Sequence, residues 1–303
     1  MSIRLENTDA HEINETLYRL RMEGKAPAKS GLVLTLVVNT TAEGYEQAME
    51  GAQAAGELHP SRILVAIRGM HNDVGLNAEI QTEQSAAEVI TLEFAGEVDQ
   101  HADSVLLPLL LSELPVVIWS RDLVPGDPAR CDLSALAHRK IVDSMTTDDP
   151  MATVYELARS HQPGTTDLSW TRLTRWRALL VAALNQVRST VTSAEVVGPL
   201  SSAPSELLAA WLRMRLQVPV LRPDAVSSYP GLHMVKLVTE AGDVVLQRFS
   251  PIEASLSLPG QPDRRVALAR RTVPQLLSEE LSRLSGDEAF DHLMAFMATE
   301  EQS

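Results

Sequence analysis

Short and nearly continuous apolar runs recur along the first half of the chain. They occupy residues 32–38, 62–67, 115–119 and, more weakly, 140–142. Their length and their β-branched residues are typical of strands that are buried on both faces, as in a parallel sheet. Residues 41–56, between the first two runs, predict a helix that Thr41 caps and Gly56 ends. Together these segments form one βαβ unit.

The rest of the first half predicts an antiparallel pair of strands and two helices. Residues 77–82 and 88–94 alternate between apolar and polar positions, and they lie close enough in sequence to pair as antiparallel strands. Residues 98–111 and 149–160 have helical patterns. Pro108 lies inside the first of these helices and is expected to limit its length.

The second half has a different pattern, which predicts a separate domain. It opens with a long helix over residues 167–187, and residues 240–242 fit a hairpin turn. The other predicted segments are strands at residues 191–197, 218–221, 232–239, 243–249, 253–258 and 265–269, and helices at residues 204–216, 274–284 and 287–298.

We therefore predict an α/β protein of two domains divided near residue 163. Residues 1–162 form a mostly parallel, Rossmann- or flavodoxin-like sheet flanked by helices. Residues 163–303 form an α+β domain.

Composition and charge exclude several classes of function. The 303-residue chain has a hydrophobic fraction of 45% and a formal net charge of -14. This balance argues against binding to nucleic acids or to anionic membranes, which need a positive field. No apolar run approaches the roughly 20 residues of a membrane span, and the charged N-terminus does not resemble a signal peptide. The single cysteine, Cys131 in a predicted loop, excludes an internal disulfide. We expect a soluble, cytoplasmic protein.

Polar residues follow the predicted parallel strands at the end where α/β sheets bind ligands. The ligand-binding candidates are Asn39, Thr41, Arg68 and Arg121. They are able to hold a phosphate or a sugar, and a helix that begins at Thr41 offers its N-terminal amides. No G-x-G-x-x-G or Walker-type loop follows any strand, so no nucleotide cofactor is predicted. The alternative is that these are ordinary polar loop residues.

The sequence contains no recognisable catalytic motif. Its eight histidines are scattered and form no H-E-x-x-H zinc signature, and no serine lies in a G-x-S-x-G elbow. We therefore predict no metal, no cofactor, no catalytic residue and no enzymatic activity.

Residues 163–180 concentrate aromatic and basic side chains, which are the residue types that dominate protein–protein hot spots. A helix over this segment is apolar nearly all round, as expected at a junction between domains or subunits. The alternative is that its two tryptophans are ordinary core residues. The partner-binding candidates in this segment are Asp167, Trp170, Arg172, Arg175, Trp176 and Arg177.

Residues 261–271 form the one basic cluster in this acidic chain. Arginines on both sides of an apolar run fit an edge strand that presents charge to solvent or to a partner. Nucleic-acid binding would need a longer patch interleaved with aromatic residues. The alternatives are a solvated, locally paired face and the recognition of an anionic ligand or an acidic surface. The candidates here are Gln261, Asp263, Arg264 and Arg265.

Five short segments in order resemble the OpcA family, the glucose-6-phosphate dehydrogenase assembly proteins of cyanobacteria and actinobacteria. They are HPSR at residues 59–62, LPLLLSELPVVIW at 107–119, DLSWTRLTRWRALL at 167–180, SELLAAWL at 205–212 and QPDRR at 261–265. The resemblance covers nearly the whole chain and is strongest to the actinobacterial branch.

The resemblance implies a non-catalytic assembly factor or allosteric activator that binds glucose-6-phosphate dehydrogenase and promotes its active oligomer. The physiological setting would be the pentose phosphate pathway and NADPH supply. Family members often carry a cysteine at the position of Ser61, and redox control through thioredoxin is associated with cyanobacterial relatives. A thiol switch within this chain is excluded, because it has one cysteine. The competing hypotheses are a sugar-phosphate sensor that uses the strand-end loops and an unrecognised sugar-phosphate enzyme.

Overall fold

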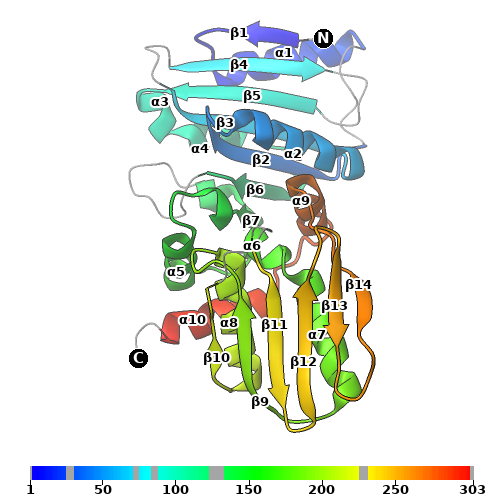
Figure 1. Cartoon of the computed structure of the whole chain (residues 1–303). Coiled ribbons are helices and arrows are strands. Elements are labelled where there is room, and N and C mark those ends of the chain that lie inside the picture. The colour runs from blue at the N-terminus through cyan, green and yellow to red at the C-terminus, as the bar shows by residue number, and fades with distance from the viewer. Residues whose placement is uncertain are drawn as a thin grey trace. The chain divides into compact units, whose positions relative to one another are not determined.

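A computed structural model describes residues 2–24, 31–70, 75–82, 88–122, 133–224 and 231–300. Cys131 and its predicted loop lie outside these ranges. The chain forms two compact units (Figure 1). The first unit consists of Met1–Thr147, Pro163–Thr166 and Val273–Asp287, and the second consists of Asp148–Gln162, Asp167–Thr272 and Glu288–Ser303.

The first unit is built around an eight-stranded sheet with the order β1-β4-β5-β3-β2-β6-β7-β8. From β5 to β7 each strand runs parallel to its neighbour, whereas β4 and β1 are antiparallel additions at one edge. The parallel core and the antiparallel pair are therefore confirmed. The strands are β1 (Ser2–Leu5), β2 (Leu34–Thr41), β3 (Ser61–Met70), β4 (Leu76–Thr82), β5 (Glu88–Ala95), β6 (Val116–Ser120), β7 (Arg139–Val142) and β8 (Thr165–Asp167).

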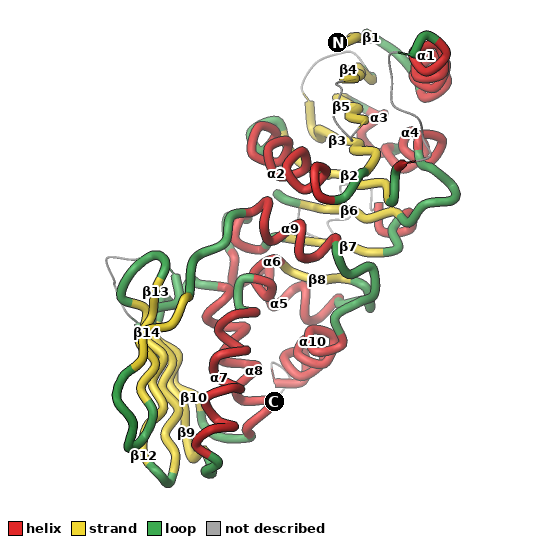
Figure 2. The backbone as a smooth tube through the Cα atoms, turned by 90° about the vertical axis from the view of Figure 1, so that its right-hand side faces the viewer, coloured by secondary structure: helices red, strands yellow, loops and turns green. Residues whose placement is uncertain are grey.

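The central strands β2 and β3 are buried over nearly their whole length, because helices cover both faces of the sheet. One face carries α2 (Tyr45–Leu58), and the other carries the segments α1, α3 and α4 (Figure 2). Leu17 of α1 and Leu106 of α4 belong to the same buried cluster as Val37, Ile90 and Phe94 of the strands. The segments of the second face are α1 (Ala10–Met22), α3 (Glu97–Gln100) and α4 (Ala102–Leu106).

Helix α9 (Val273–Leu281) packs beside α2 in the first unit, although it lies more than 200 residues later in the sequence. A Cβ atom on Gly51 of α2 would lie 3.0 Å from the ring of Trp119 and 3.6 Å from Val273. The glycine therefore lets α2 lie close to β6 and to the start of α9. His59, just after α2, lies with its Nε2 3.1 Å from the carbonyl oxygen of Ser278.

Two buried arginines fasten this unit through ion pairs. Arg139 of β7 pairs with Glu280 of α9, and its second terminal nitrogen donates to the carbonyl of Ser285. Arg62 of β3 lies 2.7 Å from the carboxylate of Glu88 on β5. Both arginine side chains are almost fully buried, so each ion pair compensates the cost of burying the opposite charge.

Two local predictions in the first unit were wrong, and three elements were not predicted. Thr41 is the last residue of β2 and not a helix cap, and α2 begins four residues later after Gly44. The helix predicted at residues 98–111 is instead three short pieces, because Pro108 lies in a 3-10 turn and α3 and α4 are separate. The pattern also gave no indication of β1, α1 or β8.

The second unit contains a six-stranded sheet with the order β10-β9-β11-β12-β13-β14. Its strands pair antiparallel except for β9 and β10, which are parallel. The predicted hairpin is confirmed, since β11 and β12 meet at the turn before Gly242. The strands are β9 (Val191–Val197), β10 (Val220–Leu221), β11 (Met234–Thr239), β12 (Gly242–Arg248), β13 (Glu253–Ser257) and β14 (Arg264–Ala267).

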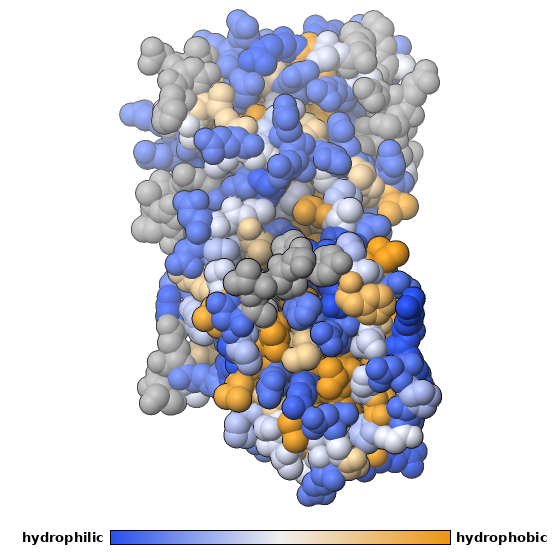
Figure 3. All heavy atoms as spheres, viewed as in Figure 1, coloured by the Kyte–Doolittle hydropathy of each residue, from blue (hydrophilic) through white to orange (hydrophobic). Residues whose placement is uncertain are grey.

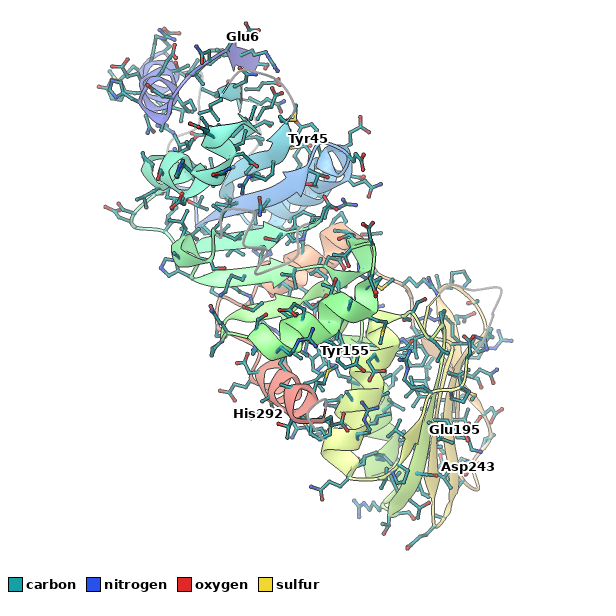
Figure 4. The ribbon with its side chains drawn as sticks, turned by 90° about the vertical axis from the view of Figure 1, so that its left-hand side faces the viewer. Glu6, Tyr45, Tyr155, Glu195, Asp243 and His292 are labelled. Atoms are coloured by element: carbon teal, nitrogen blue, oxygen red, sulfur yellow. The ribbon has the colours of Figure 1, made fainter. Side chains whose placement is uncertain are left out.

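Alternation along these strands gives the second sheet one buried face and one open face. Helices α7 and α8 lie on one side of it (Figure 2). Hydrophobic and hydrophilic residues are interspersed on the open face (Figure 3). Glu195 and Asp243 project from this face (Figure 4), and Lys236 lies 3.1 Å from the carboxylate of Asp243.

Among the described residues, five helical segments complete the second unit, and two of them replace a single predicted helix. The helix predicted over residues 167–187 is divided into α6 and α7, because Leu173 donates to the carbonyl of Trp170 three residues earlier and the chain forms a tight turn there. The segments are α5 (Pro150–Ser160), α6 (Leu168–Thr171), α7 (Thr174–Val187), α8 (Ala203–Leu216) and α10 (Glu288–Glu300).

The two units do not follow a single division of the sequence. The predicted boundary near residue 163 places α5 in the first domain and α9 in the second domain. The structure groups α5 with the second unit and α9 with the first unit. The reason is that α9 packs on α2, whereas α5 packs on α8 and α10.

Candidate functional site

The strand-end loops of the first sheet meet between β2 and β6, where the order of strands reverses. Thr40 Oγ1 donates to Asp122 Oδ2 at 2.7 Å, and the guanidinium of Arg121 pairs with the same carboxylate. Arg121 also donates to Gln47 Oε1 of α2 at 2.5 Å. A Cβ atom on Gly44 would collide with Asp122 and lie 2.6 Å from Arg121 Nη1. The groups at this reversal point are therefore closely packed and bonded to one another.

The other ligand-binding candidates are placed as follows. Thr41 Oγ1 accepts from the backbone amide of Gly44 at 3.3 Å. Arg68 faces Thr41 in the register of the two strands, but its guanidinium pairs with Asp99. Asn39 is 7% exposed, and its Oδ1 has no hydrogen-bond partner within the described part of the chain. Both arginines of the predicted set thus already have carboxylate partners. Asn39 Oδ1 and Arg68 Nη1 are buried atoms without a hydrogen-bond partner in the described ranges.

The first turn of the aromatic and basic segment, which begins at Asp167, is buried in the core of the second unit. Asp167 is buried and caps α6, since its Oδ1 accepts from the amide of Ser169 at 2.7 Å. Trp170 is 0% exposed, and its ring lies 5.9 Å from that of Phe290 in α10. The guanidinium of Arg177 stacks 3.5 Å from the centre of the Trp170 ring.

The six candidates of this segment therefore differ in how far their side chains are buried. Asp167, Trp170 and Trp176 are buried, so they shape the second unit from within. Arg172 and Arg177 are half-buried, and Arg175 is exposed. A contact between this segment and a partner stays a prediction, and in this structure it would be made by the arginines.

The candidates at residues 261–265 lie on the outermost strand of the second sheet and just before it. Gln261, Asp263, Arg264 and Arg265 are all exposed. Arg264 donates to the side-chain oxygens of Gln261 and Gln186, the second at 3.3 Å. Arg265 lies on the other side of the strand, with its guanidinium 5.4 Å from the centre of the Phe249 ring.

Sequence reasoning missed the residues around the turn between β12 and β13. Phe249 and Ile252 are 39% and 62% exposed. Arg248, the last residue of β12, is 4% exposed and donates to the carbonyls of Pro251 at 3.1 Å and Leu268 at 2.5 Å. The signal was present in the sequence, because Phe249 and Ile252 are large apolar residues that flank Ser250 and Pro251, a turn-forming pair.

Burial and the nearby charge of Arg270 lower the pKa of Arg248 to about 10. Burial also lowers the pKa of Arg270. No carboxylate is among the causes of either shift, so no nearby negative charge offsets the effect of burial. Arg248 also lies beside Trp176, 5.5 Å from the centre of its ring.

Other charged clusters in the second unit are internally paired. Glu206 of α8 accepts from Arg213 at 3.0 Å and from Arg222 at 2.5 Å. Burial, followed by the charge of Glu206, raises the pKa of Tyr155 in α5, which is labelled in Figure 4. His161 lies 2.7 Å from Asp291. These contacts join α5, α8, α10 and the chain after β10, as expected of packing contacts.

Two further findings concern the described residues as a whole. They contain no group of three or more histidine, cysteine, aspartate or glutamate residues placed to hold a metal ion. None of their helices has both the length and the apolar character needed to cross a membrane.

Two family models match the sequence. One, described as the N-terminal domain of a glucose-6-phosphate dehydrogenase subunit, matches residues 52–159. The other, described as the C-terminal domain of the same kind of subunit, matches residues 163–294. No curated protein matches the sequence.

Similarity to solved structures is low. An oxidoreductase from Sinorhizobium meliloti is 11% identical, with 89% of this chain and 87% of that chain covered and a TM-score of 0.44. An inositol dehydrogenase homologue from Azotobacter vinelandii, complexed with NADH and myo-inositol, is 9% identical, with 89% and 88% covered and a TM-score of 0.39. Similarities of this size carry no argument about function.

Proposed function

The chain belongs to the OpcA family, the glucose-6-phosphate dehydrogenase assembly proteins, and from that premise we propose that it binds this dehydrogenase and promotes its active oligomer without catalysing a reaction itself. The observation that carries the proposal is the match of both family models, one after the other, over residues 52–294. A role associated with glucose-6-phosphate dehydrogenase follows from the family. Assembly, activation, the cytoplasmic location and the setting in NADPH supply are our proposal.

The polar clusters of the structure support a binding role over a catalytic one. The strand-end groups of the first unit bond to one another, and Glu206 of the second unit is held by two arginines. A general acid or base must reach a substrate proton, and a nucleophile must have an activating base. The described clusters instead use their carboxylates to hold arginines.

A non-catalytic factor can raise the activity of an enzyme only by binding the active state more tightly than the inactive states. Shifting an oligomer equilibrium from about 1% to about 99% active requires an affinity difference of about 10⁴-fold. A smaller preference gives a proportionally smaller activation. The proposal therefore predicts that activation saturates at the value set by this difference.

The test combines activity with molecular mass. Dehydrogenase from the same organism is assayed against glucose 6-phosphate with and without the purified chain, and the mixture is passed through size-exclusion chromatography with light scattering. We expect a common peak and a higher rate or a lower KM. Two folded proteins that elute separately and give an unchanged rate would disprove the proposal.

A second candidate function is sugar-phosphate sensing by the strand-end loops. The supporting observation is Asn39, whose buried Oδ1 is without a hydrogen-bond partner in the described ranges, at the edge where ligands of α/β sheets bind. A thermal-shift titration of the chain alone with glucose 6-phosphate tests it. Ligand at 100 times Kd stabilises the folded state by about 2.7 kcal/mol, and an unchanged melting temperature would remove this candidate.

A further inference from the structure

The turn between β12 and β13 lies beside the residues that follow β14, which are more than ten positions later in the sequence. Leu268 donates to the carbonyl of Ile252 at 2.9 Å, and the backbone amide of Arg270 donates to the carbonyl of Pro251 at 3.1 Å. Arg265 reaches the same end of the sheet through its stacking contact with Phe249. We call the surface formed by Phe249, Ile252, Arg265 and Arg270 the turn surface.

The turn surface combines exposed apolar groups with exposed cations. Phe249 and Ile252 are large apolar side chains that remain accessible. Arg265 and Arg270 are exposed, and the buried Arg248 adds a third positive charge directly beneath the turn. Aromatic residues and arginines are enriched at the centre of protein–protein contacts.

The cations of the turn surface are not neutralised by any carboxylate in the part of the chain that the structure describes. Within the described ranges, Arg248, Arg265 and Arg270 form no ion pair with a carboxylate. Neither Arg248 nor Arg270 has a carboxylate among the causes of its lowered pKa. The nearest acids in sequence are Glu253 and Asp263, and among the described residues no ion pair joins either of them to these arginines. A chain of net charge -14 therefore keeps a local positive surface.

The residues that face Arg265 across the sheet are also neutral. Arg265 lies opposite Ser255 on β13, and Ser255 lies opposite Gln247 on β12. The row continues to Met234 on β11. Small or neutral neighbours leave the guanidinium free to extend along the Phe249 ring and to meet a carboxylate from outside.

We propose that the turn surface is the place where the chain binds an acidic surface of glucose-6-phosphate dehydrogenase. The partner supplies carboxylates to Arg265 and Arg270 and covers Phe249 and Ile252. This inference rests on the proposed function and gives it a location and a chemistry. It predicts binding that weakens as salt rises, because the exposed charges are screened.

The experiment measures Kd between the full chain and the dehydrogenase by calorimetry at low and at physiological salt. The test variant carries Arg265→Glu and Arg270→Glu. The matched control is Arg215→Glu, an exposed arginine near the end of α8 in the same unit. We expect the double variant to bind about 30-fold more weakly or worse and to lose its salt dependence, while the control binds as the wild type does.

The outcomes separate this inference from the proposed function. If the wild type binds and the double variant binds equally well, the turn surface is not the site, and the proposed function stands. If the wild type does not bind, both are overturned. Should the double variant fail to fold, Phe249→Ala and Arg265→Gln replace it, and unchanged Kd values for both would overturn the assignment.

Discussion

The two sheets of this protein each end in a four-residue edge strand that carries exposed arginine, and the two edges treat that charge differently. On β1, Arg4 lies 3.0 Å from the carboxylate of Glu93 on β5, so the first sheet neutralises its own edge. On β14, Arg265 stacks on Phe249, and across the sheet it faces serine and glutamine. An edge arginine that is paired within its own sheet has no charge left to pair with a partner. An edge arginine without such a pair can bind a carboxylate of a partner.

The same contrast holds for buried arginines. Arg139 in the first unit is paired with Glu280, whereas Arg248 in the second unit is held by two carbonyl groups. Removing one member of a buried ion pair leaves an uncompensated charge, while removing an unpaired cation does not. The same substitution at Arg139 and at Arg248 therefore compares the loss of stability at a paired arginine with the loss at an unpaired one.

The largest effect is expected for Arg139→Met. It leaves Glu280 buried without its cation, and we expect the free energy of unfolding to fall by about 3–5 kcal/mol. Urea denaturation followed by circular dichroism measures it. Arg265→Met is the exposed control and should change stability by less than about 0.5 kcal/mol. Equal losses at both positions would show that the ion pair contributes nothing beyond packing.

Gly44→Ala is expected to have the next largest effect. The added methyl group collides with Asp122 and approaches Arg121 and Thr40, so the strand-end network must shift. We expect a loss of about 1–3 kcal/mol, as for other overpacked sites. The matched control is Gly31→Ala, since a Cβ atom there meets nothing within 4 Å. A stable Gly44→Ala variant would mean that the network is looser than its hydrogen bonds indicate.

Arg248→Met should cost about 1 kcal/mol or less. The variant loses hydrogen bonds to two carbonyl groups, each worth about 1 kcal/mol. It also removes a buried cation that forms no ion pair with a carboxylate of the described residues. The measurement is the same urea titration. A loss as large as that of Arg139→Met would contradict the distinction between paired and unpaired arginines.

The smallest effect concerns the closed edge strand. Hydrogen bonds from Ser2 and then Gln81 lower the pKa of Glu79. A lowered carboxyl pKa stabilises the folded state above the pKa of the unfolded chain, and this contribution is lost as pH falls through the folded pKa. Ser2→Ala should therefore cost a few tenths of a kcal/mol at pH 7 and nothing at pH 2. A cost that persists at pH 2 would assign it to packing.

Much of the fold was predictable because strand burial leaves a simple pattern. The apolar runs at residues 32–38 and 62–67 became the central parallel strands β2 and β3. Alternation predicted the antiparallel strands β4 and β5, and the turn at residues 240–242 predicted the hairpin of β11 and β12. The position of α9 was not predictable, because its apolar face fits either unit and only its packing on α2 decides between them.

The sequence identified the segments that contain the candidate residues. It did not show which of their side chains are exposed or which side chains they contact. The pattern at residues 163–180 marked important side chains, but burial of Trp170 depends on the ring of Phe290 more than 100 residues later. The arginine at position 265 was identified from its neighbours in sequence. Its partner Phe249 belongs to another strand, and contacts across strands depend on register, which a local pattern does not determine.

The interleaved segments of the two units have a consequence for how the molecule is made. The chain passes from one unit to the other after residues 147, 162, 166, 272 and 287. During synthesis, neither unit can complete its core until α9 and α10 have left the ribosome, because these late helices belong to different units. Until α9 and α10 emerge, the apolar faces that these helices cover in the two units stay exposed. A premature stop before residue 273 would deprive both units of a helix at once.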